Sequence, residues 1–196
     1  MERHSRVTGD GRSLCSSKQE QISMQTVDLR EDAKIFRREL EAAIEPIVAS
    51  KPSCLSAIEI GYSCDQSGWI FIHPDERPAH QRDGEWTTRI EDEKLIKYDH
   101  WIEAIEASFE GKAFTVIKYD GSKFEVAFDE DEPEEDSEDP FVKAVGEMIL
   151  EVLRAAKVDG VFSQLKPFGS VQLDIEDFNG GWGWPEYDDL GKTNFA

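Results

Sequence analysis

The chain has 196 residues, which is enough for one domain with or without tails. Its net charge of −20 repels nucleic acid and anionic membranes and favours a basic protein partner or bound cations, with plain solubility as the competing explanation. Because it has three scattered cysteines, no long apolar run and no apolar stretch behind its basic N-terminus, we expect a protein of the reducing cytoplasm with no membrane span or secretory signal.

The first residues differ in composition from the rest of the chain. Residues 1–25 are rich in Ser, Arg, Gly and Gln and show no apolar period, which predicts a disordered tail ahead of a single domain at 26–196. Asp28 and Glu31 then stand at the spacing of a capping box. Apolar residues follow at helical spacing, namely Leu29, Phe36, Leu40, Ile44 and Ile47. This pattern predicts an amphipathic helix from Asp28 to about Ala49.

Two hairpins and a second helix are predicted next. Residues 57–62 alternate, residues 69–73 form another apolar run, and the polar stretch between them is typical of a turn. The residues from 95 to 109 have helical periodicity. Two alternating segments, 114–119 and 124–128, then flank Asp120 and Gly121, and a DG pair between such segments is a strong hairpin signal.

An acidic tract separates the second hairpin from the last helix. Residues 129–139 contain nine carboxylates in eleven positions, which predicts a solvated loop. Asp139 and Pro140 are a good helix start, and the apolar stripe behind them predicts a helix that ends near Asp159. A final strand is predicted around 171–175.

This order of elements predicts the fold class. Because no strand–helix–strand unit repeats along the chain, we expect an α+β fold with a largely antiparallel sheet of about five strands and about three helices on one face.

Several groups of residues are weak candidates for metal binding or nucleophilic catalysis. Cys54, Cys64, His73 and His80 offer zinc ligands, but their spacing fits no zinc motif, and a Cys64–His73 nucleophilic pair has no supporting signature. The acidic tract lacks the ordered ligand spacing of a calcium loop. We therefore expect neither a metal nor another cofactor.

A group of C-terminal carboxylates supports an alternative, enzymatic hypothesis. Paired carboxylates can act as acid and base or hold Mg²⁺. The candidates are Asp174, Glu176 and Asp177, with Glu186, Asp188 and Asp189 close by in the sequence. No glycine-rich loop, Walker lysine or serine elbow accompanies them, so a divalent-metal-dependent enzyme ranks below a non-catalytic protein.

The C-terminal segment is dense in glycine and aromatic residues. Trp182, Trp184 and Tyr187 have side chains that often anchor protein interfaces, while a strap that covers the core is the competing structural explanation. We expect the acidic tract, through Glu134, Glu135 and Asp136, to attract a basic partner that these aromatic side chains then bind.

The chain resembles the small acidic bacterial immunity proteins encoded beside polymorphic toxins. The resemblance covers about residues 26–190 and rests on the helix from Asp28, the two hairpins and the ending Gly180-Gly181-Trp182-Gly183-Trp184-Pro185. It implies a cytoplasmic, non-catalytic inhibitor that binds a toxin. The alternatives are the metal-dependent enzyme and an interaction module that has no connection with a toxin.

Overall fold

The computed structural model describes residues 24–52, 54–64, 67–77, 94–127 and 139–178. These residues form two sheets, three α-helices and one 3₁₀ helix. In chain order the elements are β1 (Thr26–Asp28), α1 (Leu29–Ser50), β2 (Ala57–Ser63), β3 (Trp69–Asp75), β4 (Lys94–Lys97), α2 (Asp99–Phe109), β5 (Phe114–Ile117), β6 (Lys123–Val126), α3 (Pro140–Val158), η3 (Val161–Phe168) and β7 (Gln172–Asp177).

The predicted α+β class is confirmed, but the prediction of a single, largely antiparallel sheet is wrong, because the structure has two mixed sheets. One sheet has the strand order β4-β3-β2-β7 and the other has the order β1-β5-β6. Each hairpin is extended by a strand from a distant part of the chain, because β7 pairs in parallel with β2 and β1 pairs in parallel with β5. The two hairpins therefore belong to different sheets, and both sheets are mixed.

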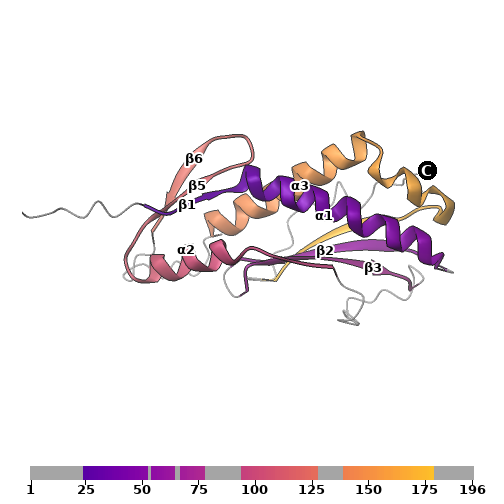
Figure 1. Ribbon diagram of the computed structural model, residues 1–196, viewed down its shortest axis with the longest axis horizontal. Coiled ribbons are helices and arrows are strands. Elements are labelled where there is room, and N and C mark those ends of the chain that lie inside the picture. The colour runs from indigo at the N-terminus through magenta and orange to yellow at the C-terminus, as the bar shows by residue number, and fades with distance from the viewer. Residues whose placement is uncertain (1–23, 53, 65–66, 78–93, 128–138, 179–196) are drawn as a thin grey trace, which may run out of the picture.

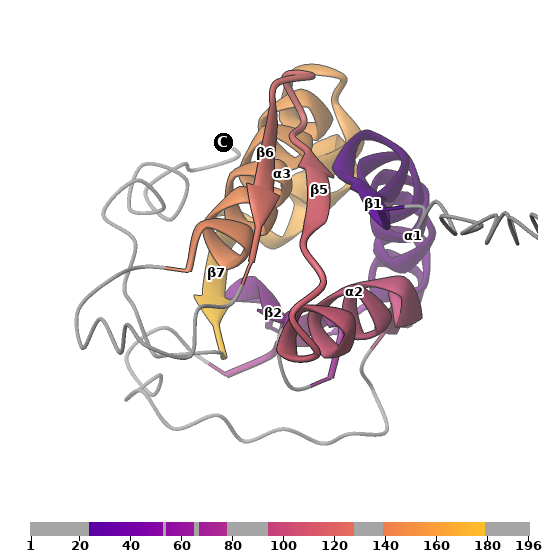
Figure 2. The same ribbon diagram turned by 90° about the vertical axis from the view of Figure 1, so that its left-hand side faces the viewer.

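Two of the three α-helices pack on one face of the four-stranded sheet. Helices α1 and α3 run side by side above β2 and β3, while α2 and the three-stranded sheet lie at one end of the molecule (Figure 1). The end view shows β5 and β6 in front of α3 and β1 at the start of α1, with α2 below them (Figure 2). The core joins Phe36 and Leu40 of α1, Met148 and Ile149 of α3, and Ile60 of β2, all fully buried.

Local signals place the ends of α1 and α3 where the sequence predicts them. The carboxylate of Asp28 accepts a hydrogen bond from the backbone N–H of Arg30, and Asp139 accepts one from Phe141 at 2.7 Å. Both residues are N-caps that satisfy backbone donors with no partner inside the helix. Pro140 is the first residue of α3, where its missing N–H costs no hydrogen bond.

The second helix begins later than the sequence predicts. The helix α2 starts at Asp99, and the residues before it form the edge strand β4, paired antiparallel with β3. The backbone N–H of Tyr98 bonds to the carbonyl of Gly68 at 2.7 Å, which continues the contact with the β3 side of the hairpin up to the helix. Cross-strand hydrogen bonding with β3 therefore decides the structure of Lys94–Lys97, although the helical period read from the sequence begins at Leu95.

Candidate functional site

The partner-binding residues predicted from the sequence lie outside the described residues. These are Glu134, Glu135, Asp136, Trp182, Trp184 and Tyr187. Most of the acidic tract lies outside as well, and so do residues 1–23 of the predicted tail. The candidate site below is therefore built from other side chains.

The Cys64–His73 pair is separated by the register of its hairpin. Ser63 pairs with Trp69 at the turn, whereas His73 pairs with Glu59 toward the open end of the hairpin. Cys64 is buried in the core next to the turn, so the strand geometry places the thiol and the imidazole at opposite ends of the hairpin.

The carboxylates of β7 are placed in part. Asp174 is in register with Glu59, and Glu176 is in register with Gly61. Within the described part of the chain, no group of three or more His, Cys, Asp or Glu side chains has an arrangement that holds a metal ion. His80, Glu186, Asp188 and Asp189 lie outside that part.

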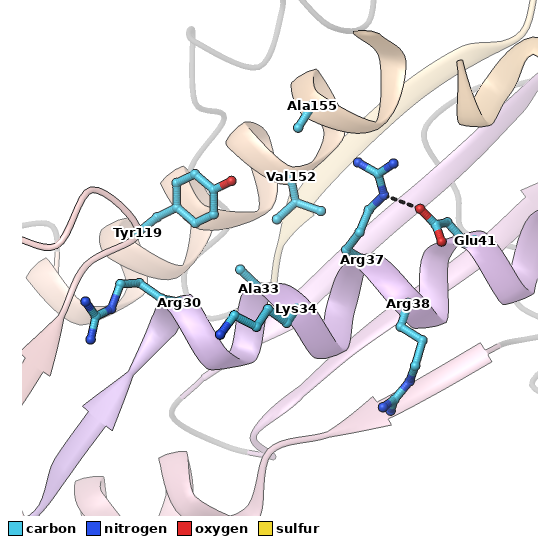
Figure 3. A pocket seen from close by; sticks show the side chains of 9 residues that line it. All are labelled: Arg30, Ala33, Lys34, Arg37, Arg38, Glu41, Tyr119, Val152 and Ala155. Atoms are coloured by element: carbon cyan, nitrogen blue, oxygen red, sulfur yellow. Dashed lines mark hydrogen bonds and ion pairs between the residues drawn. The ribbon is translucent and has the colours of Figure 1, made fainter. Parts of the chain in front are cut away.

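A hollow on the described surface lies in a groove between α1 and α3, which we call the α1–α3 groove. Its volume is about 530 Å³, within the usual range of ligand pockets. It has an apolar floor, a charged rim and an aromatic ring at one end (Figure 3). Its lining consists of Arg30, Ala33, Lys34, Arg37, Arg38, Glu41, Tyr119, Val152 and Ala155.

The sequence of α1 explains the rim of the groove. Arg30, Lys34, Arg37 and Arg38 follow one another at spacings of four, three and one residues, so they share one side of the helix, while the apolar stripe of α1 faces the core. These four cations therefore lie on the rim of the groove rather than in the core.

Short side chains explain the floor. Ala33 on α1 and Val152 on α3 are each 3% exposed, and Ala155 lies one turn further along α3. Two alanines and a valine where two helices approach one another leave space that longer side chains would fill. The floor is consequently apolar and shallow.

Tyr119 comes from a third element, the turn between β5 and β6. Hydrogen bonds from Gly121 N–H to the carbonyl of Lys118 and from Lys118 N–H to that of Ser122 hold this turn closed. The ring of Tyr119 is 40% exposed and points along the groove toward Val152 (Figure 3). An exposed tyrosine on a fixed turn is a typical interface anchor, because few rotamers are lost on binding.

The cations of the rim all have partners within the chain. Lys34 pairs with Glu31 at 2.6 Å, and Arg38 pairs with Glu39 at 2.8 Å. Arg37, whose side chain is 23% exposed, contacts both Glu41 and Asp159. Exposed pairs of this kind contribute about 0–1 kcal/mol each, so a partner's carboxylate can replace one of the chain's own at little cost.

At one end of the rim, Arg30 binds Asp28 through two side-chain hydrogen bonds of 2.9 and 2.6 Å. These hydrogen bonds hold the pKa of Asp28 below its usual value and raise that of Arg30. Both groups therefore stay charged at neutral pH.

A second, smaller hollow adjoins the groove at Tyr119 and has the opposite charge. Its volume is about 250 Å³, and it lies between the β5–β6 turn and α3. Three carboxylates and one ammonium group line it, and the ammonium of Lys118 pairs with Glu147 at 2.5 Å. The complete lining is Lys118, Tyr119, Asp120, Ala144, Glu147 and Glu151. Tyr119 thus stands between a cationic hollow and an anionic one.

The sequence alone does not identify these residues as a site. Four cations on one side of α1, in a chain with 42 acidic residues, are visible in the sequence. The participation of Tyr119 and Val152 is not, because they reach the groove only through the tertiary packing of α1, α3 and the β5–β6 turn.

Comparisons of the chain with protein-family models, with curated proteins and with solved structures found no match. None of the helices in the described part of the chain combines the length and apolarity required to cross a membrane.

Proposed function

We propose that this chain is a non-catalytic binding protein, an immunity-type inhibitor that binds a basic protein toxin in the cytoplasm. The observation that carries the proposal is the α1–α3 groove with Tyr119 at its end. An apolar centre, a charged rim and an exposed aromatic side chain on a rigid scaffold are the usual parts of a protein interface.

The charge distribution supports a basic partner. The net charge is −20, and the acidic excess is concentrated outside the described residues, above all in the tract at 129–139. Such a field accelerates the encounter with a basic protein and repels nucleic acid. In this proposal Glu134, Glu135 and Asp136 attract the partner over a distance, and Tyr119 holds it.

Aromatic contacts would then determine how slowly the complex dissociates. Tyr119 is the anchor on the described surface, and Trp182, Trp184 and Tyr187 are proposed as further anchors from the sequence. Differences in affinity among variants of one interface arise mostly in the dissociation rate. Loss of Tyr119 should therefore shorten the lifetime of the complex more than it slows its formation.

The test is affinity capture from a lysate of the native host with the full chain as bait. We expect a basic protein to be retained at low salt and released as the salt concentration rises, because screening weakens charge–charge attraction. Tyr119→Ala should weaken its binding by about 2 kcal/mol, the loss typical of an anchor. Phe109→Ala is the matched control, since Phe109 is an exposed aromatic residue on α2 that does not line the groove.

Capture of no basic protein would contradict the proposal, and so would either of two results with a captured protein. One is a partner that the Tyr119→Ala and Phe109→Ala variants retain as well as the unmodified chain does. The other is retention that does not depend on salt. With the captured protein in hand, neutralising Glu134, Glu135 and Asp136 together should mainly slow association, because exposed charges affect the approach more than the bound state.

A further inference from the structure

The residues that line the α1–α3 groove carry more positive than negative charge, in contrast to the chain as a whole. Four cations and one carboxylate line it, although the whole chain carries −20. A partner that touched only the general surface of this chain would need to be basic. A segment that enters this groove contacts the cationic side chains of its rim.

We propose that the α1–α3 groove takes an acidic segment of the partner protein that carries an apolar side chain at its centre. This inference deepens the proposed function, because it names the part of the bound protein that Tyr119 and the rim contact. In such a complex, the apolar side chain covers Ala33 and Val152, and the flanking carboxylates meet Arg30, Lys34 and Arg37.

The rim has donors left for these carboxylates. Within the described residues, Arg30 binds Asp28 through Nε and Nη2, and Arg37 uses Nε for Glu41 and Nη2 for Asp159. The Nη1 atom of both guanidinium groups is therefore available to a carboxylate. Lys34 has three N–H donors and contacts Glu31 with one of them. Hydrogen bonds between such cations and a carboxylate are charge-assisted and stronger than neutral ones.

The size of the groove fits this occupant. A volume of about 530 Å³ is more than one aliphatic side chain fills, and the small residues Ala33, Val152 and Ala155 lie between the two helices (Figure 3). An amphipathic segment can lie in such a groove with one apolar side chain toward the floor, as in helix-in-groove recognition. The ring of Tyr119 would close one end of the floor over that side chain.

A basic partner and an acidic bound segment are compatible. The long-range field that attracts a protein sums all of its charges, whereas the groove contacts only a few residues. The acidic tract can attract the basic surface of the partner while the groove binds one locally acidic segment. The opposite charges of the two hollows beside Tyr119 would also fix the orientation of the complex, since a reversed segment places like charges together.

The experiment measures the binding of two labelled synthetic peptides to the full chain by fluorescence anisotropy. The first repeats leucine and glutamate so that leucine lies on one helical face, and the second has lysine in place of every glutamate. The net charge of the chain alone would favour the lysine peptide. We expect saturable binding of the glutamate peptide.

A matched pair of charge reversals locates the binding. Lys34→Glu should lower the affinity of the chain for the glutamate peptide about tenfold or more, because the substitution removes a rim cation and adds a repelling charge. Lys112→Glu changes the net charge equally and also breaks a short-range Lys–Glu pair, but Lys112 does not line the groove. It should change the affinity by no more than about twofold, through long-range repulsion alone. Thermal unfolding of both variants checks that they fold.

The inference is overturned if the glutamate peptide does not bind, or if Lys34→Glu and Lys112→Glu lower its affinity equally. In either case the proposed function survives when Tyr119→Ala still reduces capture of the basic partner, since another segment of that partner would then fill the groove. Conversely, peptide binding at the groove without capture of a basic protein supports this inference and contradicts the proposed function.

Discussion

The indole nitrogen of Trp101 donates a 2.8 Å hydrogen bond to the carboxylate of Asp32, which lies 69 positions earlier in the chain. Asp32 is 3% exposed on α1, and Trp101 is fully buried on α2. The same carboxylate oxygen lies 3.1 Å from Nε2 of His100, and the hydroxyl of Tyr98 donates to the carbonyl of Asp32. One residue of α1 therefore fixes the start of α2 at three points.

Removal of this carboxylate should destabilise the fold. In an Asp32→Ala variant the buried N–H of Trp101 has lost its acceptor, which costs about 1–3 kcal/mol for the unsatisfied donor alone. Asp32→Asn retains an amide oxygen as an acceptor and should cost less. Urea unfolding followed by tryptophan fluorescence measures both. Glu106→Ala, at an exposed position of α2, is the control and should stay within about 0.5 kcal/mol of the unmodified chain.

The His100–Asp32 contact should make the stability depend on pH. The hydrogen bond with Asp32 raises the pKa of His100 above the ordinary histidine value of 6.5, and the charges of Asp32, Glu103 and Asp99 act in the same direction, while burial opposes them. The folded state therefore binds the proton more tightly than the unfolded state does. The resulting stabilisation is fully present below pH 6.5 and is lost as the pH rises through the folded-state pKa.

The measurement for His100 is a difference between two chains. Unfolding free energies of the unmodified chain and of His100→Gln are compared across the neutral pH range, so that contributions from other groups cancel. We expect the difference in favour of His100 to shrink as the pH rises, and an NMR titration of the ring should give a pKa above 6.5. A difference that grows with pH would contradict the assigned contact.

The local parts of the fold were predictable from the sequence, and the long-range pairings were not. N-caps at Asp28 and Asp139 and the turn at Gly121 are determined by residues within a few positions of each other, so local patterns reveal them. The strand β1 has only three residues and exists because β5 pairs with it. Nothing within 26–28 indicates such a pairing, and the same holds for the parallel addition of β7 to β2.

The candidate site was predictable to a smaller extent. The charged stripe of α1 follows from helical spacing, but Tyr119 was assigned to a strand and instead lies in the turn that follows β5. The contact of Asp32 with His100 spans 68 positions and depends on where α2 packs. The two hollows lie between elements of the fold, so their residues are brought together only by tertiary structure.

The turn at Gly121 offers a test of the second hairpin. Gly121 has a φ of 86°, a left-handed conformation that β-branched residues avoid. No atom lies within 4 Å of an added Cβ, so the cost of Gly121→Val arises from the backbone alone and should be about 1–2 kcal/mol. Lys123→Val introduces the same side chain at an exposed strand position and should be nearly neutral. Equal losses of unfolding free energy in Gly121→Val and Lys123→Val would show that the valine side chain, and not the conformation of the turn, causes the destabilisation.

Gly61 should be intolerant of any side chain, for a reason that differs from that at Gly121. It lies in the middle of β2, opposite Phe71 of β3, and an added Cβ would stand 2.2 Å from the Phe71 ring and 2.7 Å from the ring of Phe178. The two rings pack edge to face with centroids 5.5 Å apart, so neither can move without losing contact with the other. Overpacking of this kind costs about 1–3 kcal/mol, which we expect for Gly61→Ala.

A double-mutant cycle separates this clash from a change in the backbone of β2. Phe71→Leu removes the ring edge that meets the new methyl group, so Gly61→Ala should cost less in the Phe71→Leu background than in the unmodified chain. The coupling energy should be of the order of 1 kcal/mol in favour of the double variant, as for other residues in direct contact. If Gly61→Ala costs the same in both backgrounds, the ring of Phe71 does not limit the space at Gly61. The glycine would then be required for the strand itself, and the packing of the aromatic rings over β2 would have to be revised.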